Sequence, residues 1–141
     1  MSLRDMGLRL LMIKCPWLIH MELPAAAEMQ IYIETARRRQ QQQRAQLRQR
    51  REQGFELAKI AARLLREEFG VSRIVLFGSA LSDATFHITS DLDLAVWDLP
   101  PADYLKAVAR LMTLSDFSID LVEAEAAAPH IQEGIAQGIE L

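Results

Sequence analysis

The sequence predicts an α/β domain in which a small β-sheet is flanked by helices and preceded by a long amino-terminal helical segment. Residues 25–69 contain no proline and are rich in Ala, Glu, Gln, Arg and Leu, which favours a helix. Three short stretches have the β-branched composition or the alternation of strands: residues 73–77, 91–97 and 117–122. Helical patterns lie before, between and after these strands. Their order is helix, strand, strand, helix, strand, helix.

Composition and charge define the class of protein. The chain has 141 residues, half of them hydrophobic, which fits one soluble domain and excludes a disordered or collagen-like chain. Its formal charge of −3 combines +5 in residues 1–70 with −8 in residues 71–141. The lone Cys15 excludes an intramolecular disulfide and a cysteine-built zinc site. These features indicate a reducing compartment, and we expect a cytoplasmic protein.

The beginning of the chain has one apolar stretch, residues 6–19. Arg9, Lys14 and Pro16 interrupt it, and it is shorter than the roughly 20 apolar residues that span a bilayer. We therefore expect neither membrane insertion nor secretion, and we treat residues 1–24 as an amino-terminal extension. An Arg/Gln-rich helix over residues 25–53 and a folded domain over residues 54–141 follow.

The long helix predicted for residues 25–69 would be about 67 Å long if it were unbroken, so we expect a break or bend near Gly54. After Gly54, apolar residues form a face wide enough to pack on a sheet. They are Phe55, Leu57, Ala58, Ile60, Ala61, Ala62, Leu64, Leu65 and Phe69. Residues 35–51 instead hold no acid and seven arginines, namely Arg37, Arg38, Arg39, Arg44, Arg48, Arg50 and Arg51. That segment is too polar to belong to a core.

The remaining elements follow in order. Gly70 stands where helices commonly end, and strand 73–77 comes directly after it. Between the second and third strands, Pro100 and Pro101 break the chain and residues 102–114 show helical spacing. A last short helix is predicted to start at Pro129.

Three carboxylates occur at positions that favour a metal site. Because side chains in a strand alternate, Asp91 and Asp93 should project from one face, about 7 Å apart along the chain. Asp120 interrupts the apolar third strand, where an isolated charge is costly unless it is paired. If the third strand lies beside the second, the three acids cluster. Oxygen ligands of this kind suit Mg²⁺ or Mn²⁺.

Gly78 and Ser79 follow the first strand directly, where the chain must turn. Glycine lets the backbone come close to a ligand, and a serine hydroxyl beside backbone N–H groups suits a polyphosphate. Taken alone, a Gly-Ser turn and an Asp-x-Asp strand are also common features of proteins without such a site.

In combination these motifs resemble a known family. The stretch LFGSALSDATFHITSDLDLAV, followed by SIDLV, is similar to the DNA polymerase β-like nucleotidyltransferases, whose signature is a hydrophobic strand, Gly-Ser, a spacer, Asp-x-Asp and a later Asp. The small size resembles the minimal nucleotidyltransferases, or MNT proteins, commonly encoded beside a HEPN-domain toxin. The resemblance covers about half of the chain, roughly residues 55–122. It implies a small mixed sheet flanked by helices.

The resemblance also implies residue roles. Gly78 and Ser79 would hold the triphosphate of ATP, while Asp91, Asp93 and Asp120 would be the catalytic and metal-binding acids, with Asp120 readying the attacking group. Residues 54–141 would then be the nucleotidyltransferase domain. The sequence departs from many relatives after Gly-Ser, where it has no early second glycine, and its spacer of residues 80–90 is one residue longer than is common.

Three functions follow from these observations. The first is metal-dependent transfer of AMP from ATP to a HEPN-type toxin, because few residues follow the third strand to form an acceptor-binding domain. The second is an antitoxin that neutralises its partner by contact alone, with the long helix as a docking element or a homo-oligomer interface. The third is nucleic-acid binding by an arginine stripe at residues 37, 44, 48 and 51. Against the third function, no aromatic residue lies among the arginines and the other half of the chain is acidic.

Overall fold

The computed structural model describes residues 25–141, so the expectations for residues 1–24, for the apolar stretch 6–19 and for Cys15 lie outside the described residues. The chain divides into two units, residues 1–41 and 42–141. The described part of the first unit, residues 25–41, is helical from Ala26 onward and exposed throughout. In residues 25–141, none of the helices is long and apolar enough to cross a membrane.

The long helix α2 runs from Ala26 to Phe69, as predicted, and it is not broken at Gly54. Gly54 is buried, and a Cβ atom at this position would lie 3.2 Å from Cδ2 of Leu92. The glycine therefore lets the helix approach a strand closely; it does not end the helix. Every buried residue of α2 lies at or after Gly54, but Ile60, expected on the apolar face, is 51% exposed.

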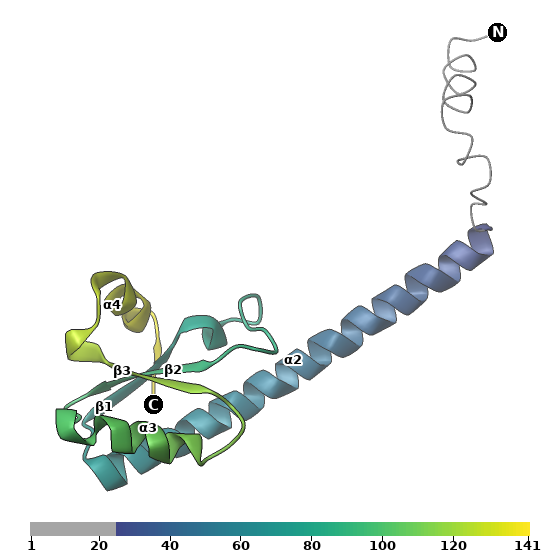
Figure 1. Ribbon diagram of the computed structural model, residues 1–141. Helices are drawn as coiled ribbons and strands as arrows, with labels where there is room; N and C mark the ends of the chain where they lie inside the picture. Colours follow the sequence, from purple (N-terminus) through teal and green to yellow (C-terminus); the bar gives the residue numbers. More distant parts are fainter. Residues whose placement is uncertain (1–24) are drawn as a thin grey trace, which may run out of the picture. The chain divides into compact units, whose positions relative to one another are not determined.

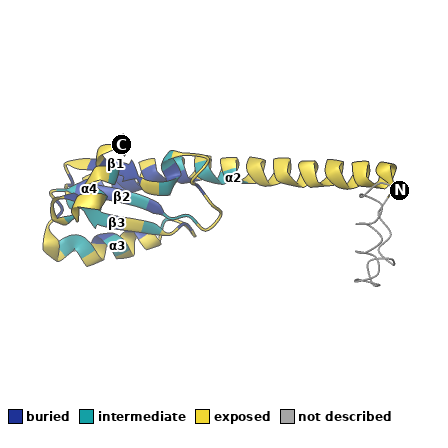
Figure 2. Cartoon of the chain, turned by 90° about the horizontal axis from the view of Figure 1, so that it is seen from above, coloured by how far each residue is buried: buried dark blue, intermediate teal, exposed yellow. Residues whose placement is uncertain are grey.

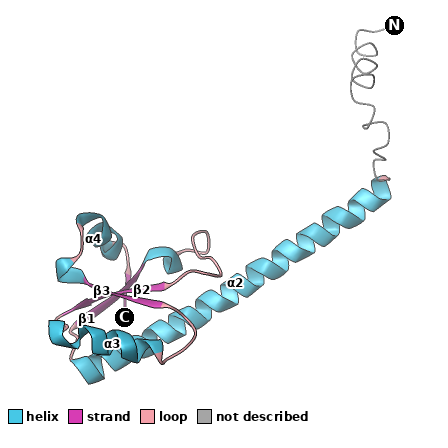
Figure 3. Ribbon diagram, viewed as in Figure 1, coloured by secondary structure: helices cyan, strands magenta, loops and turns pink. Residues whose placement is uncertain are grey.

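The second unit is built on a mixed four-stranded sheet of order β3-β2-β1-β4. Figure 3 shows its strands in magenta among the helices of this unit. The strands are β1 (Arg73–Phe77), β2 (Leu92–Trp97), β3 (Ile119–Glu123) and β4 (Ile139–Glu140). Strand β1 pairs antiparallel with β2 and β4, whereas β2 and β3 are parallel. The three predicted strands are confirmed to within two residues at each end. Strand β4 was not predicted, because two residues are too few to show alternation.

Helices connect and cover the strands. The 3₁₀ helix η2 (Gly78–Leu81) follows β1, and η3 (Pro101–Asp103) leads into α3 (Tyr104–Met112). After β3 come η4 (Ala124–Ala126) and α4 (Pro129–Ala136). A parallel β2–β3 pair needs such a crossover, which α3 supplies. The helices predicted after Pro100-Pro101 and at Pro129 are thus confirmed.

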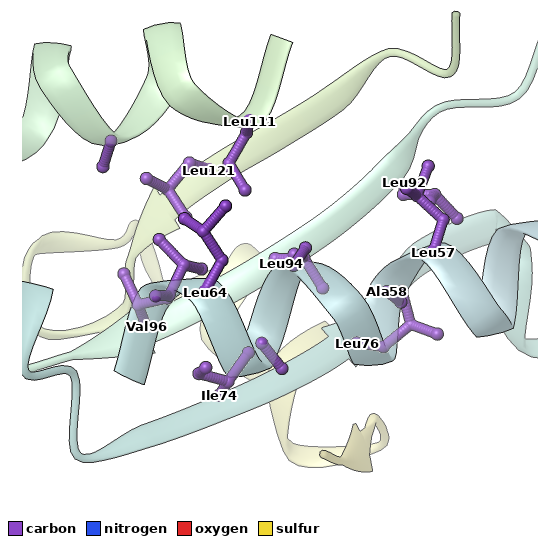
Figure 4. Close-up of a cluster of buried hydrophobic side chains, with 14 of the residues drawn as sticks. Leu57, Ala58, Leu64, Ile74, Leu76, Leu92, Leu94, Val96, Leu111 and Leu121 are labelled. Atoms are coloured by element: carbon purple, nitrogen blue, oxygen red, sulfur yellow. The ribbon is translucent and has the colours of Figure 1, made fainter. Parts of the chain in front are cut away.

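A larger core fills one face of the sheet and a smaller one fills the other. On the first face, side chains from the second half of α2 and from α3 pack on Leu92, Leu94 and Val96 of β2, which are at most 2% exposed (Figure 4). On the second face α4 packs over β1 and β2 (Figure 1). Figure 2 shows this burial across the sheet. Because residues alternate along β2, Asp93 lies on the second face.

Candidate active site

The carboxylates of Asp93 and Asp120 lie on neighbouring strands of the second face. Strands β2 and β3 are parallel and in register, with Asp93 opposite Asp120. Opposed residues of adjacent strands project from the same face, so these two acids share it. Asp91 immediately precedes β2, whose first residue is Leu92. The structure therefore brings together Asp93 and Asp120, with Asp91 at the entrance to the strand.

The electrostatics of Asp93 reflect this proximity. The pKa of Asp93 is raised to about 6, first by burial, then by the negative charges of Asp120 and Asp91, and by the hydrogen bond that its protonated form shares with Asp120. Each cause disfavours the ionised form. A cation bound beside these carboxylate oxygens would favour the ionised form of Asp93, because its positive charge would attract the carboxylates that otherwise repel one another.

Gly78 lies directly against Asp93. Phe77 pairs with Asp93 across β1 and β2, and the chain turns into η2 at Gly78 with a φ angle of +83°. A Cβ atom on Gly78 would overlap Oδ2 of Asp93 and lie 3.2 Å from its Cγ. Only glycine meets both conditions, since other residues are strained at this φ and have no room for a side chain. The start of the Gly78-Ser79 turn is thus within contact distance of the acid pair.

A cavity of about 430 Å³ opens beside the acid pair. Its lining residues come from β1, β2, β3, α3 and α4, and they are Phe77, Asp93, Tyr104, Val108, Ile119, Asp120, Leu121, Val122 and Ile131. The Tyr104 hydroxyl donates a hydrogen bond of 2.8 Å to the Leu121 carbonyl, which ties α3 to β3. Ser79 and Asp91 are not among the lining residues. The cavity therefore lies on the Asp120 side of the pair.

The donor set is that of a hard divalent cation, since it consists of carboxylate oxygens. Among residues 25–141, no group of three His, Cys, Asp or Glu side chains is arranged to hold a metal ion. The close approach of the Gly78 backbone to the Asp93 carboxylate and the raised pKa of Asp93 nevertheless fit a cation held at this place. Asp93 and Asp120, which oppose each other across β2 and β3, would be its first ligands. Asp91, directly before β2, would be the third.

Two further residues contact the loop that joins Ser79 to Asp91. Arg51 of α2 donates hydrogen bonds to the carbonyls of Ala80 and Leu81, at 2.7 and 2.9 Å. Arg50 donates to the carbonyl of Ile88 at 3.2 Å. Both arginines lie in the segment predicted to be too polar for a core, and neither is buried, but their contacts with this loop were not predicted. The missed signal is their place directly before Gly54, where the apolar face begins.

The chain is similar to several solved structures. No family model matches the chain, and no curated protein matches it. A mutant of the MntA–HpeT toxin–antitoxin complex, with two aspartates one residue apart replaced by glutamates, is 26% identical. The match covers 59% of this chain and 70% of that chain, with a TM-score of 0.50. A mutant of the same complex with a tyrosine replaced by alanine is 30% identical and covers 59% and 69%, with a TM-score of 0.49.

A third structure, assigned to the minimal nucleotidyltransferases, is 26% identical and covers 70% of this chain and 95% of that chain, with a TM-score of 0.42. The structure matched at a TM-score of 0.50 supports this fold, as does the mixed sheet itself with its parallel β2–β3 pair. The fold and the similarity agree with the order of motifs in the sequence, which is Gly-Ser, then Asp-x-Asp, then a single Asp. The chain therefore has the small mixed sheet flanked by helices that was expected for a polymerase β-like nucleotidyltransferase fold, and it is similar to the MntA–HpeT toxin–antitoxin structure.

Proposed function

We propose that this nucleotidyltransferase transfers AMP from ATP, with Mg²⁺ or Mn²⁺, to a HEPN-type toxin and so acts as an antitoxin. The observation that carries the proposal is the contact of three elements: Asp93 opposes Asp120 across β2 and β3, and Gly78 lies against the Asp93 carboxylate. The closeness of this glycine turn to the two acids supports a phosphate site beside a divalent cation. The similarity to a toxin–antitoxin complex supports the choice of partner.

In this proposal the residues take the roles that the family resemblance implies. Gly78 and Ser79 hold the triphosphate, because the missing side chain at Gly78 lets the backbone of this turn lie against Asp93, beside the proposed metal. Asp91, Asp93 and Asp120 hold the metal, which when bound supplies neutralisation of the charge on the phosphate oxygens. Asp120, the more exposed of the pair on β2 and β3, also accepts the proton of the attacking hydroxyl group of the partner. That hydroxyl oxygen bonds to the α-phosphorus of ATP, and pyrophosphate leaves. The cavity beside it gives that group access.

Label transfer tests this function. The protein is incubated with Mg²⁺, α-labelled ATP and a purified HEPN-type partner, and the label on the partner is measured. We expect labelling by the wild type and a loss of at least about 1,000-fold in Asp93→Asn, equivalent to about 4 kcal/mol of transition-state stabilisation. Asp116→Asn, which changes an exposed acid outside the site, is the matched control and should label normally.

Two results would change this view. If the wild type labels no partner, and Mg·ATP at millimolar concentration leaves its melting temperature unchanged, the nucleotidyltransferase function is refuted. If Asp93→Asn no longer labels the partner but still suppresses its toxicity in cells, contact alone accounts for neutralisation. The exposed Met29, Tyr32 and Ile33 of α2, at 43–67% exposure, favour this second candidate because they offer apolar contact area.

A further inference from the structure

The loop of residues 80–90 separates the two halves of the proposed site. Gly78 and Ser79 stand before it and Asp91 follows it, so its path decides where the phosphate turn lies relative to the acids. Inside the domain it is anchored by two buried side chains, Ala80 and Phe86, at 1% and 2% exposure. Thr85 ties the loop to the turn, because its hydroxyl donates to the Ser79 carbonyl at 2.9 Å.

Helix α2 holds the same loop from outside. The Arg51 guanidinium bonds to the carbonyls of Ala80 and Leu81, and it forms an ion pair of 3.1 Å with Asp83. Its side chain is only 21% exposed and lies over the Phe55 ring, with its Cζ 4.9 Å from the ring centroid. All these contacts fall at the Ser79 end of the loop.

Arg50 acts at the other end. Its Nε donates to the Ile88 carbonyl, and its Cζ lies 4.0 Å from the centroid of the Phe117 ring. Adjacent residues of one helix therefore fix both ends of the loop. A helix is a rigid support, so the distance between the two fixed ends is set by α2 and not by the loop.

From these contacts we infer that Arg51 is a positioning residue for the Gly78-Ser79 turn, and that Arg50 supports it from the Asp91 side. The inference rests on the proposed nucleotide-binding role of that turn. A guanidinium suits this task because its planar array of donors reaches two carbonyls and a carboxylate at once. A lysine ammonium in the same place could satisfy only part of the set, so it should restore only part of the function.

The test compares Arg51→Met and Arg51→Lys with Arg48→Met. Arg48 lies on the same helix, carries the same charge and is exposed. It lines a small pocket beside Asp83 and Phe86, so it is the matched control for a positive charge near the loop. Binding of Mg·ATP is measured by calorimetry on variants whose melting temperatures show that they are folded. We expect about tenfold weaker binding in Arg51→Met, which corresponds to about 1.4 kcal/mol, an intermediate value in Arg51→Lys and the wild-type value in Arg48→Met.

A second measurement needs no nucleotide. Amide hydrogen exchange of residues 79–90 should be faster in Arg51→Met than in the wild type and unchanged in Arg48→Met, because Arg51 donates hydrogen bonds to the Ala80 and Leu81 carbonyls. Wild-type exchange in a folded Arg51→Met overturns the inference, as does an equal loss of Mg·ATP affinity in Arg48→Met, which would indicate general attraction of the anion. If the wild type binds no Mg·ATP, the proposed function fails, but the exchange result still decides whether Arg51 positions the loop.

Discussion

The two faces of β2 differ in what they contribute to the protein. On one face Leu92, Leu94 and Val96 are at most 2% exposed and pack against α2 and α3. On the other face Asp93 stands beside Asp120, and its pKa is raised because burial and like charges disfavour ionisation. One strand thus carries side chains that stabilise the fold and, between them, a carboxylate that destabilises it when charged.

The difference separates structural from functional residues. An apolar side chain in a core is explained by the free energy of burial. A partly buried acid next to a second acid has no such explanation, and perturbed carboxylates of this kind occur mainly at functional sites. The predictions below change one face at a time.

The largest effect is expected on the apolar face. Leu94→Ala removes a side chain with 0% exposure and leaves a cavity between β2 and α2, so it should lower the free energy of unfolding by about 3 kcal/mol. Leu105→Ala removes the same atoms from a position that is 78% exposed and should change it by less than about 0.5 kcal/mol. Urea denaturation of both variants measures the difference. Equal effects would mean that Leu94 is not part of the core.

A smaller loss is expected where the turn meets the carboxylate face. Gly78→Ala introduces a Cβ at a φ of +83° and against Asp93, and should cost about 2 kcal/mol. Gly70→Ala is the matched control, because the φ angle of Gly70 is also positive, at +68°, but no atom lies within 4 Å of the added Cβ. This variant should lose only the backbone strain, about 1 kcal/mol. Thermal unfolding gives both values. A Gly70 variant as unstable as the Gly78 variant would remove the argument for crowding by Asp93.

The contribution of Asp93 to the free energy of unfolding should depend on pH in the opposite direction from that of most acidic groups. The folded pKa of Asp93 is about 6 against 3.8 for an unperturbed group, so the folded state binds the proton more tightly. The destabilising contribution is therefore present above pH 6, declines as the pH falls through 6 and vanishes below about 3.8. Without metal, Asp93→Asn should be more stable than the wild type at pH 7.5, by less than about 1 kcal/mol for this partly exposed group.

Melting temperatures in EDTA at several pH values between 4 and 7.5 test this expectation. The advantage of Asp93→Asn should shrink steadily toward acid. With Mg²⁺ and ATP the order should reverse, because the ligands stabilise only the protein that binds them. A variant less stable than the wild type at pH 7.5 in EDTA would show that charged Asp93 is well accommodated.

The sequence predicted the fold where a pattern was long enough to repeat. β-branched composition identified β1, and alternation identified β2 and β3. Glycine at residue 70 marked the helix end, where Gly70 N–H donates to the Arg66 carbonyl. The break expected at Gly54 was wrong, because glycine in a helix can serve a close approach as well as a turn. That approach involves Leu92, which is distant in sequence and visible only in three dimensions.

The site was predictable to a similar extent. Period-two spacing placed Asp93 opposite the apolar face, and the parallel pairing of β3 with β2 brought Asp120 beside it. The contact of Gly78 with Asp93 could not be derived, since it depends on the antiparallel register of β1 and β2. The link from Arg51 to the loop was hidden for another reason. Seven arginines in one segment have the same composition whether they contact solvent, a partner or the domain itself.

The smallest effect concerns the remaining arginines of that segment. Arg44 and Arg48 are exposed, whereas Arg51 contacts the loop, so a test of docking must leave Arg51 unchanged. Reversing Arg44 and Arg48 to Glu should weaken assembly with an acidic surface, on a partner or a second copy, by less than about 1 kcal/mol per charge, because exposed ion pairs are well screened. The effect should appear in sedimentation or calorimetry at low salt and disappear near 0.5 M salt, where the Debye length is only several ångström. Intact assembly combined with lost retention on RNA or DNA would instead identify the exposed arginines as a phosphate-binding stripe.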